Sequence, residues 1–198
     1  MQIHKGFIAI DGPNGAGKST LIGLLKFELQ HSMQTVVFTK EPTNSKLGEF
    51  IRSNQHIYHG KELGALVAAD RYHHIGNLIL PELEKGKIVI TDRYLASSLV
   101  YQQMDGLSTA FILALNSEII LPSTYFILKV SETTLHKRLS ERSELTRFES
   151  FENTIQEGAL YDNAGSILDK LGVKVIYINN DIVTAEENAV MIIKEILS

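Results

Sequence analysis

Short apolar runs alternate with amphipathic stretches along the whole chain. The apolar runs are rich in Val, Ile and Phe and end at Gly, Pro or polar residues, which is typical of buried strands. They predict five strands, at 7–10, 36–39, 88–91, 125–130 and 173–179. The stretches between them have apolar residues at helical spacing and predict helices at 19–31, 45–54, 63–85, 97–103, 108–120, 131–142, 154–171 and 184–197. This alternation is typical of an α/β fold, so we expect a five-stranded parallel sheet with helices on both faces.

The composition limits the number of domains and the classes of partner, but it does not indicate a function. The 198 residues contain no repeat or low-complexity linker and are enough for one α/β domain, which we expect to span 1–198. A net charge of −4 gives no basic face for a nucleic-acid polymer, and no apolar run approaches the ~20 residues of a membrane span. There is no cysteine and no apolar signal-peptide core near the N-terminus. We therefore expect a cytoplasmic protein without a nucleic-acid or membrane partner.

The first predicted strand runs into a glycine-rich turn and then into a helix. The segment from Gly12 to Ser19 fits G-x-x-x-x-G-K-[ST], the phosphate-binding P-loop. Its glycines let the backbone wrap a polyphosphate, and the helix N-terminus adds a positive dipole. Lys18 adds a full charge at the β- and γ-phosphates, and the Ser19 hydroxyl can ligate Mg²⁺. A chance turn is the alternative, but the flanking strand and helix favour a nucleotide site. It would comprise Gly12, Asn14, Gly15, Ala16, Gly17, Lys18, Ser19 and Thr20.

Asp92 follows the third predicted strand directly. That strand is apolar at consecutive positions, as a strand buried on both faces should be, and Asp92 emerges at its carboxyl end. A carboxylate across from Ser19 is the arrangement that holds Mg²⁺ in P-loop enzymes. The alternative is that Asp92 caps the next helix. We favour the metal role because the strand pattern and the P-loop agree.

Three other segments allow an ordinary and a functional interpretation. The polar turn 40–43 is either a site wall beyond a strand end or a plain turn. The charged segment 137–149 is either a solvated helix face or a lid over a transferred phosphoryl group. Arg71 lies inside an apolar helical pattern, and from the residues alone we expect it to reach solvent rather than to bind an anion. His73 and His74 lack the spacing of a helical metal pair, so we expect them to be structural or at the surface.

At Asp92 the ordered motifs become similar to those of the thymidylate kinase family, P-loop kinases of nucleoside monophosphates. The resemblance runs essentially end to end, and the ordered set is more specific than any single motif. It is carried by the P-loop, by Lys40-Glu41-Pro42, by Asp70-Arg71-x-x-His74, by Asp92-Arg93-Tyr94 with Ser97, Ser98, Tyr101 and Gln102, and by Arg142 with Arg147-Phe148-Glu149.

The resemblance implies roles for these residues. Arg71 would grip the 5′-phosphate of the substrate as a bidentate fork, and Arg93 would lie between the donor and acceptor phosphates. Tyr101 would pack under the deoxyribose. One branch of the family has arginine at the position of Gly15; here the cationic groups would come from a lid at about 138–150. The implied catalytic residues are Lys18, Arg93, Arg142 and Arg147, and the implied metal ligands are Ser19 and Asp92. The implied substrate contacts are Asp11, Asn14, Lys40, Pro42, Val67, Arg71, Arg93, Ser97, Ser98, Tyr101 and Gln102.

Four positions depart from the family pattern. Asn14 stands where a carboxylate usually faces the sugar 3′-hydroxyl, and Val67 stands where a phenylalanine usually stacks on thymine. Lys40 replaces an arginine and loses its fork geometry, and Lys129 replaces an acid. The first three surround the acceptor sugar and base, whereas the phosphate-binding residues are intact.

The expected function is therefore an ATP- and Mg²⁺-dependent kinase of a deoxynucleoside 5′-monophosphate, with dTMP as the expected acceptor. The acceptor phosphate is already anionic, so positioning and electrostatics suffice without a general base. The departures Val67 and Asn14 leave open a kinase of another or modified nucleotide. A non-catalytic P-loop regulator is the second alternative, and Arg71 and Arg93 argue against it. The homodimers of the family imply a homodimer.

Overall fold

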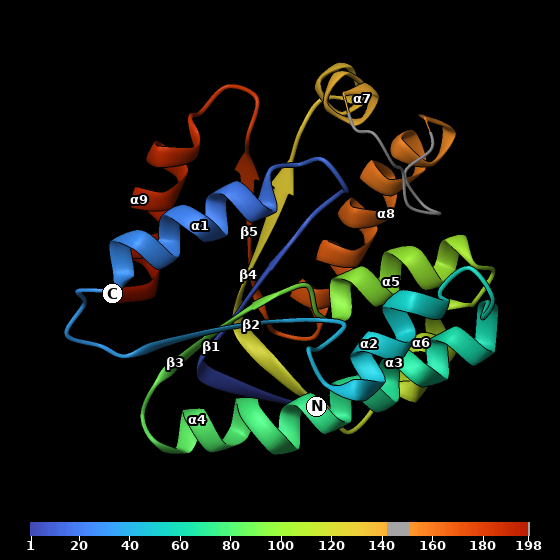
Figure 1. Cartoon of the computed structure of the whole chain (residues 1–198), viewed down its shortest axis with the longest axis horizontal. Coiled ribbons are helices and arrows are strands. Elements are labelled where there is room, and N and C mark those ends of the chain that lie inside the picture. Colours follow the sequence, from blue (N-terminus) through green and yellow to red (C-terminus); the bar gives the residue numbers. More distant parts are fainter. Residues whose placement is uncertain (142–150, 198) are drawn as a thin grey trace.

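A single parallel sheet forms the centre of the computed structural model, which describes residues 1–141 and 151–197. Its order is β2-β3-β1-β4-β5, so the strand that leads into the P-loop is central. The strands are β1 (Gln2–Asp11), β2 (Val36–Lys40), β3 (Ile88–Asp92), β4 (Ile120–Lys129) and β5 (Lys174–Asn179). The expected five-stranded parallel sheet is confirmed, and the arrangement is that of the P-loop NTPase fold (Figure 1).

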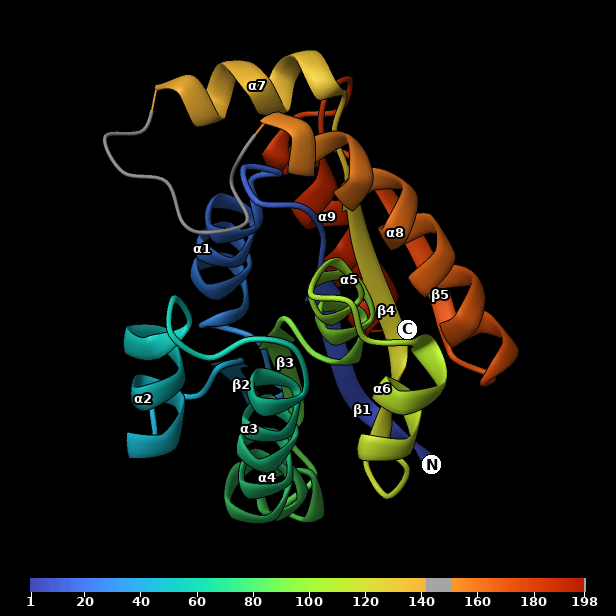
Figure 2. The same ribbon diagram turned by 90° about the vertical axis from the view of Figure 1, so that its right-hand side faces the viewer.

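Helices cover both faces of the sheet because successive β1 residues point to opposite sides. Phe7 and Ala9 pack with residues of α5, α6 and α8, whereas Ile8 and Ile10 pack with residues of α1, α7 and α9. Figures 1 and 2 show these two helical layers, with α7 beyond the carboxyl end of β4. The helices are α1 (Lys18–Leu29), α2 (Lys46–Asn54), α3 (Gly60–His74), α4 (Leu80–Glu84), α5 (Leu95–Met104), α6 (Thr109–Leu115), α7 (Glu132–Ser140), α8 (Phe151–Lys170) and α9 (Ala185–Leu197).

The helix predicted at 63–85 contains a π-helical turn, Ile75–Ile79, between α3 and α4. Pro81 explains it, because proline has no N–H to donate and its ring excludes the carbonyl one turn earlier. The chain widens by one residue before Pro81, so that the N–H of Leu80 donates to the carbonyl of Ile75.

The helix predicted at 108–120 is too long, because α6 ends at Leu115 and Ile120 already belongs to β4. Pro122 lies within β4 opposite His4, where the β1–β4 register shifts before Ile8. An irregular ladder tolerates a residue without an N–H. None of the described helices is long and apolar enough to cross a membrane.

The strand register places the polar residues at the carboxyl ends of β1, β2 and β3 next to one another. Ile10 pairs with Asp92 across β1 and β3, and Lys40 pairs with Asp92 across β2 and β3. The carboxyl ends of these strands therefore meet beside the P-loop, as expected for a ligand site in an open parallel sheet.

Candidate functional site

The P-loop needs glycine where its backbone turns most sharply. Gly12 has φ +144°, and a Cβ there would lie 2.9 Å from the carbonyl oxygen of Leu128. Gly17 has φ +93° and is the residue before α1, whose first turn therefore points its free N–H groups at the loop. The result is a cavity of about 720 Å³, the loop pocket. It is lined by Asn14, Gly15, Gly17, Lys18, Ser19, Thr20, Asp92, Arg93, Arg138 and 180–185.

Lys18 folds back onto its own loop. Its Nζ donates to the carbonyl oxygens of Gly12 at 2.7 Å and Pro13 at 2.8 Å. Burial and then the positive charge of Arg93 lower the pKa of Lys18 from 10.5 to about 7, against the opposing effect of the Asp92 carboxylate. The nearby carboxylates thus offset the cost of burying the ammonium only in part, and a polyphosphate would add the anionic charge that stabilises it.

Asp92 and Ser19 are suited to Mg²⁺. Both line the loop pocket, and the buried Oδ1 of Asp92 has no hydrogen-bond partner in the described part of the chain. Burial raises the pKa of Asp92, and the charges of Lys18 and Arg93 oppose this rise only in part. A bound cation would therefore stabilise the buried carboxylate further. The alternative that Asp92 caps a helix is wrong, because the capping position of α5 is Tyr94.

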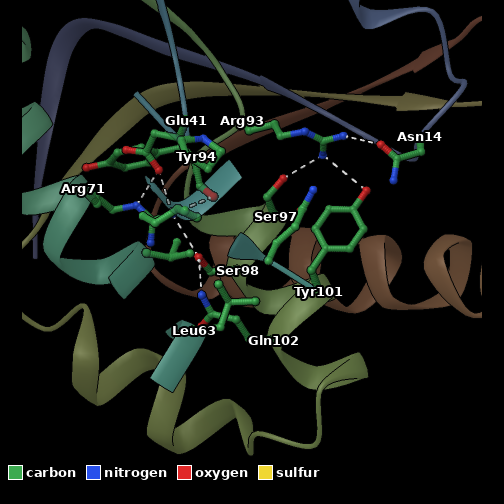
Figure 3. Close-up of a pocket in the computed structure, with 14 residues that line it drawn as sticks. Asn14, Glu41, Leu63, Arg71, Arg93, Tyr94, Ser97, Ser98, Tyr101 and Gln102 are labelled. Atoms are coloured by element: carbon green, nitrogen blue, oxygen red, sulfur yellow. Dashed lines mark hydrogen bonds and ion pairs between the residues drawn. The ribbon is translucent and has the colours of Figure 1, made fainter. Parts of the chain in front are cut away.

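A second cavity, the side pocket, lies next to the loop pocket and holds about 210 Å³ (Figure 3). Its walls come from the segment after β2, from α2, α3 and the start of α5. They are lined by Asn14, Glu41, Pro42, Ile51, Gln55, Leu63, Val67, Arg71, Arg93, Tyr94, Ser97, Ser98, Tyr101 and Gln102.

Arg93 stands where the two pockets meet and is held in an unusual backbone conformation. It is the sole non-glycine residue with a positive φ, +70°, in the described ranges. Its Nη1 donates to Ser97 Oγ at 2.9 Å and to the hydroxyls of Tyr101 and Tyr161 at 3.3 Å each. Its Nη2 donates to Asn14 Oδ1 at 2.7 Å (Figure 3). Only a fifth of the side chain is exposed, so the charge is fixed in place and faces the junction.

Asp11 is fully buried and organises the start of α5. Its Oδ2 accepts the backbone N–H groups of Tyr94 and Ser97, each at 3.1 Å. Its Oδ1 accepts the hydroxyls of Ser97 at 2.7 Å and Tyr161 at 2.8 Å, and the N–H of Gly12 at 3.1 Å. A carboxylate at a helix start also stabilises the helix dipole. This predicted substrate residue therefore lies beneath the pockets, and it lines neither of them.

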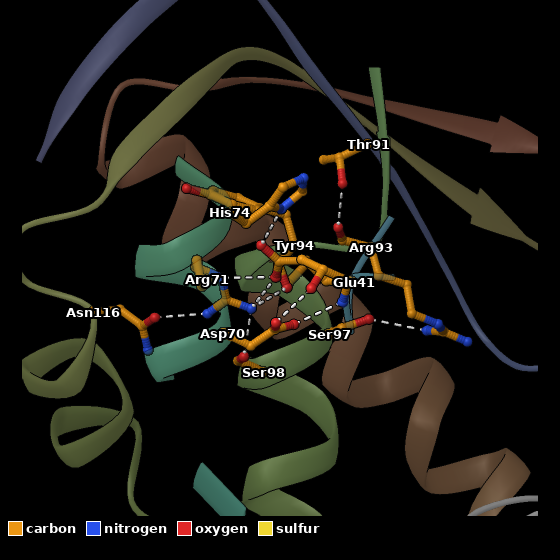
Figure 4. Close-up of polar contacts among 12 residues, drawn as sticks. Glu41, Asp70, Arg71, His74, Thr91, Arg93, Tyr94, Ser97, Ser98 and Asn116 are labelled. Atoms are coloured by element: carbon orange, nitrogen blue, oxygen red, sulfur yellow. Dashed lines mark hydrogen bonds and ion pairs between the residues drawn. The ribbon is translucent and has the colours of Figure 1, made fainter. Parts of the chain in front are cut away.

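The prediction that Arg71 reaches solvent is wrong, because only 1% of its side chain is exposed. Its Nε donates to Glu41 Oε2 at 2.9 Å, Nη1 to Asn116 Oδ1 at 2.6 Å, and Nη2 to Ser98 Oγ at 2.9 Å and the Tyr94 carbonyl at 3.1 Å (Figure 4). Burial alone would lower the pKa of Arg71, but the charge and hydrogen bond of Glu41 together with the nearby Tyr94 and Tyr125 outweigh burial, and the pKa is raised. These bonds use four of the five N–H groups, so a bidentate grip on phosphate would require Arg71 to release a partner.

Asp70 and His74, on the same helix, tie α3 to the segment after β2. Asp70 accepts the backbone N–H of Thr43 at 2.7 Å and its hydroxyl at 2.6 Å. The two ring nitrogens of His74 contact Glu41 Oε1 at 3.1 Å and Thr39 Oγ1 at 2.7 Å. His74 is thus a buried structural residue, and the described part of the chain holds no group of three or more His, Cys, Asp or Glu side chains that could bind a metal ion.

Most of the predicted site residues line one of the two pockets. Lys40 is exposed at the end of β2 and lines neither, and Gly12 and Ala16 form the loop beneath the loop pocket. Arg142 and Arg147 lie outside the described residues. The predicted residues on the pocket walls are Asn14, Gly15, Gly17, Lys18, Ser19, Thr20, Pro42, Val67, Arg71, Asp92, Arg93, Ser97, Ser98, Tyr101 and Gln102.

The matches with known proteins agree with this site. A family model described as thymidylate kinase matches residues 10–188. The chain belongs to the thymidylate kinase family. A relative named "Probable thymidylate kinase", from Thermococcus kodakarensis, is 32% identical over 205 residues, which cover 96% of this chain and 98% of that protein. Another of that name, from Caldivirga maquilingensis, is 37% identical over 159 residues, 76% of this chain and 77% of that protein.

A solved structure shares the fold. The crystal structure of thymidylate kinase from Ehrlichia chaffeensis aligns with a TM-score of 0.70 at 24% identity, covering 98% of this chain and 100% of that chain. Membership of the family makes the chain a phosphotransferase of the nucleoside monophosphate kinase type.

Other residues of this thymidylate kinase family member that hold the P-loop are not among the predicted site residues, although Arg138 lies at the start of the predicted lid segment. Arg138 donates to the Gly15 carbonyl at 3.2 Å, and Asn180 Nδ2 donates to the Ala16 carbonyl at 2.7 Å, so both hold the P-loop from the side of the loop pocket. Asn180 follows a strand end, which is a usable signal. On α8, Glu157 accepts the backbone N–H of Asn14 in the loop, and Tyr161 donates to Asp11 just before the loop, but single residues on a helix give no such signal.

Proposed function

We propose that the chain transfers the γ-phosphoryl group of ATP to the 5′-phosphate of dTMP, giving dTDP and ADP. The observation that carries the proposal is the meeting of two pockets at Arg93, one built by a P-loop and the other walled by apolar and polar side chains. Relatives named probable thymidylate kinase, which align over most of this chain, support dTMP as the acceptor.

The donor nucleotide would lie in the loop pocket. The free N–H groups at the start of α1 and the Lys18 ammonium would bind its β- and γ-phosphates, and Lys18 would exchange the carbonyls of Gly12 and Pro13 for phosphate oxygens. Ser19 and Asp92 would hold Mg²⁺, which when bound neutralises phosphate charge.

The acceptor would lie in the side pocket with its phosphate toward Arg93. The opposite end offers Ser98 and Gln102, whose Oε1 has no hydrogen-bond partner in the described part of the chain. A buried polar atom without a partner favours a ligand that supplies one. Arg71 lies beside Ser98 with most of its donors in use, so we assign the acceptor phosphate to Arg93 and place Arg71 at the base end.

Transfer then depends on positioning and charge. The acceptor phosphate oxygen is anionic, so the reaction needs no base from the protein. Arg93, fixed between the two pockets, would stabilise the charge that spreads over the transferring group. Arg142 and Arg147 stay proposed as lid residues that add to this charge, and a closed lid would limit ATP hydrolysis by water.

The test is an ADP-release assay with ATP and a panel of dTMP, dUMP, dCMP and dGMP. We expect dTMP to give the highest kcat/KM, with dUMP about 5- to 10-fold lower because one buried methyl group is lost. Equal turnover across the panel would reject dTMP as the specific acceptor. Absence of ADP release with every monophosphate would reject the kinase itself.

A second candidate is a kinase of a modified pyrimidine deoxynucleotide. Val67 lines the side pocket together with the aliphatic Ile51 and Leu63, so this wall offers no aromatic face to stack on a base. Adding 5-substituted dUMP analogues to the same panel tests this candidate, which requires one of them to exceed dTMP.

The homodimer, which rests on the family, and the cytoplasmic location remain proposals. Light scattering of the purified chain at micromolar concentration tests the first, and a mass of one chain would reject it. Cell fractionation tests the second.

A further inference from the structure

Asn14 occupies a position that the phosphates must approach. It lines both the loop pocket and the side pocket, and among the described residues Arg93 is the sole other residue that does so. Asn14 therefore stands at the junction where donor and acceptor would meet, next to the charge that the proposed transfer needs.

Both parts of Asn14 are anchored. Its backbone N–H donates to Glu157 Oε2 of α8 at 3.1 Å, which fixes this part of the loop. Its Oδ1 accepts Nη2 of Arg93 at 2.7 Å, a short charge-assisted hydrogen bond (Figure 3). Because Oδ1 is used in this way, the side chain is oriented by Arg93 rather than left to rotate.

The remaining partners of Arg93 leave Asn14 with a distinct task. Ser97, Tyr101 and Tyr161 all contact Nη1, whereas Asn14 is the one hydrogen-bond partner of Nη2 in the described ranges. Asn14 and the Tyr101 ring, whose centroid lies 5.2 Å from the guanidinium carbon, together set the orientation of the guanidinium and the face that Arg93 presents at the junction.

Arg93 also has one anionic neighbour. Nη1 lies 3.7 Å from Asp11 Oδ1, and Asp11 is fixed by its other bonds. A carboxylate, which the family pattern usually has at position 14, would offer Nη2 the same kind of acceptor. The Asn14 amide supplies this acceptor without a second negative charge beside Arg93.

We propose that Asn14 is a positioning residue for Arg93, which holds the guanidinium across the pocket junction while leaving its positive charge to the phosphates. The inference rests on the proposed function. It differs from the sugar contact that the family resemblance implies, and the two assignments predict different results with an acceptor that lacks the 3′-hydroxyl.

The first experiment compares the parent with Asn14→Ala and Asn14→Asp, using dTMP and 2′,3′-dideoxythymidine monophosphate as acceptors. We expect Asn14→Ala to lower kcat about tenfold with both acceptors, with KM for the monophosphate changed less than about twofold. Asn14→Asp keeps an acceptor for Nη2 and should lose less kcat than Asn14→Ala. A loss confined to dTMP would overturn the inference, because it indicates contact with the 3′-hydroxyl. An Asn14→Asp variant that loses as much kcat as Asn14→Ala with both acceptors would overturn it as well, because the hydrogen bond to Nη2 would then not matter.

The second experiment is a double-mutant cycle with Arg93→Lys, which removes the Nη2 donor. In that background Asn14→Ala should change kcat by less than about twofold, because the group it positions is gone. An unchanged tenfold effect would show that Asn14 acts independently of Arg93 and would overturn the inference even if one variant is less stable. A parent without turnover rejects the proposed function, whereas parent turnover with the wrong variant pattern rejects the inference alone.

Discussion

ATP binding is expected to weaken as the pH rises above 7, because Lys18 then loses its proton. Burial and the charge of Arg93 lower the pKa of Lys18 to about 7 in the nucleotide-free protein. A bound polyphosphate favours the charged ammonium, so the complex keeps the proton to higher pH and binding takes up a proton in this range. Raising the pH therefore favours the free state.

The size of the effect follows from the pKa. With a pKa of about 7, roughly half of Lys18 is protonated at pH 7, about a tenth at pH 8 and about a hundredth at pH 9. If the ammonium form alone binds, the Kd for ATP is expected to rise about fivefold from pH 7 to 8 and about ninefold more from pH 8 to 9. Together these changes amount to about 2 kcal/mol of binding free energy.

Calorimetric titration with a non-hydrolysable ATP analogue measures this dependence. A terminal phosphate itself titrates near pH 6, so the comparison is made from pH 7 to 9, in buffers of different ionisation enthalpy to count the proton taken up. Lys18→Arg is the matched control, because arginine stays charged and its Kd should be flat over this range. A flat Kd in the parent, or the same slope in Lys18→Arg, would refute the assignment.

Three further changes test other parts of the site. Asp92→Asn removes a proposed metal ligand and should raise the Mg²⁺ concentration for half-maximal activity about 10-fold or more; an unchanged requirement in a Mg²⁺ titration contradicts the role. Asn116→Ala leaves the buried Nη1 of Arg71 without its acceptor and should lower the free energy of unfolding by about 1–3 kcal/mol in urea. Asn77→Ala on an exposed surface is the control, expected within about 0.5 kcal/mol, and equal effects of the two would argue against the buried bond. Val67→Phe should lower the KM for dTMP about 2- to 10-fold by adding a ring against the base, whereas a higher KM would show that the side pocket has no room for it.

Features that depend on neighbouring residues in the chain could be predicted from the sequence. The run 7–10, the glycines after it and Lys18 specify a strand, a turn and a helix start within fourteen residues, and the structure contains all three. Asp92 could be placed at the site because a buried strand leads directly to it and the parallel register aligns strand ends.

Side-chain contacts between residues far apart in the sequence could not be predicted in the same way. Arg71 looks like a lone charge on an apolar helix, and its burial follows from Glu41 and Asn116, which lie 30 and 45 positions away. Nothing local indicates that these side chains converge. Similarly, the Oδ1 of Asn14 is used by Arg93, 79 positions away, so its contact could not be derived from the P-loop alone.

The backbone of Arg93 has a consequence for anyone who redesigns this protein. A left-handed conformation costs a non-glycine residue about 1 kcal/mol or more, and glycine or asparagine would relieve it. A redesign guided by folding stability would therefore favour replacing the residue on which the proposed chemistry most depends. Folding stability therefore favours glycine or asparagine at this position, whereas the proposed activity requires arginine. A thermostabilised variant should retain Arg93 and carry its stabilising substitutions at other positions.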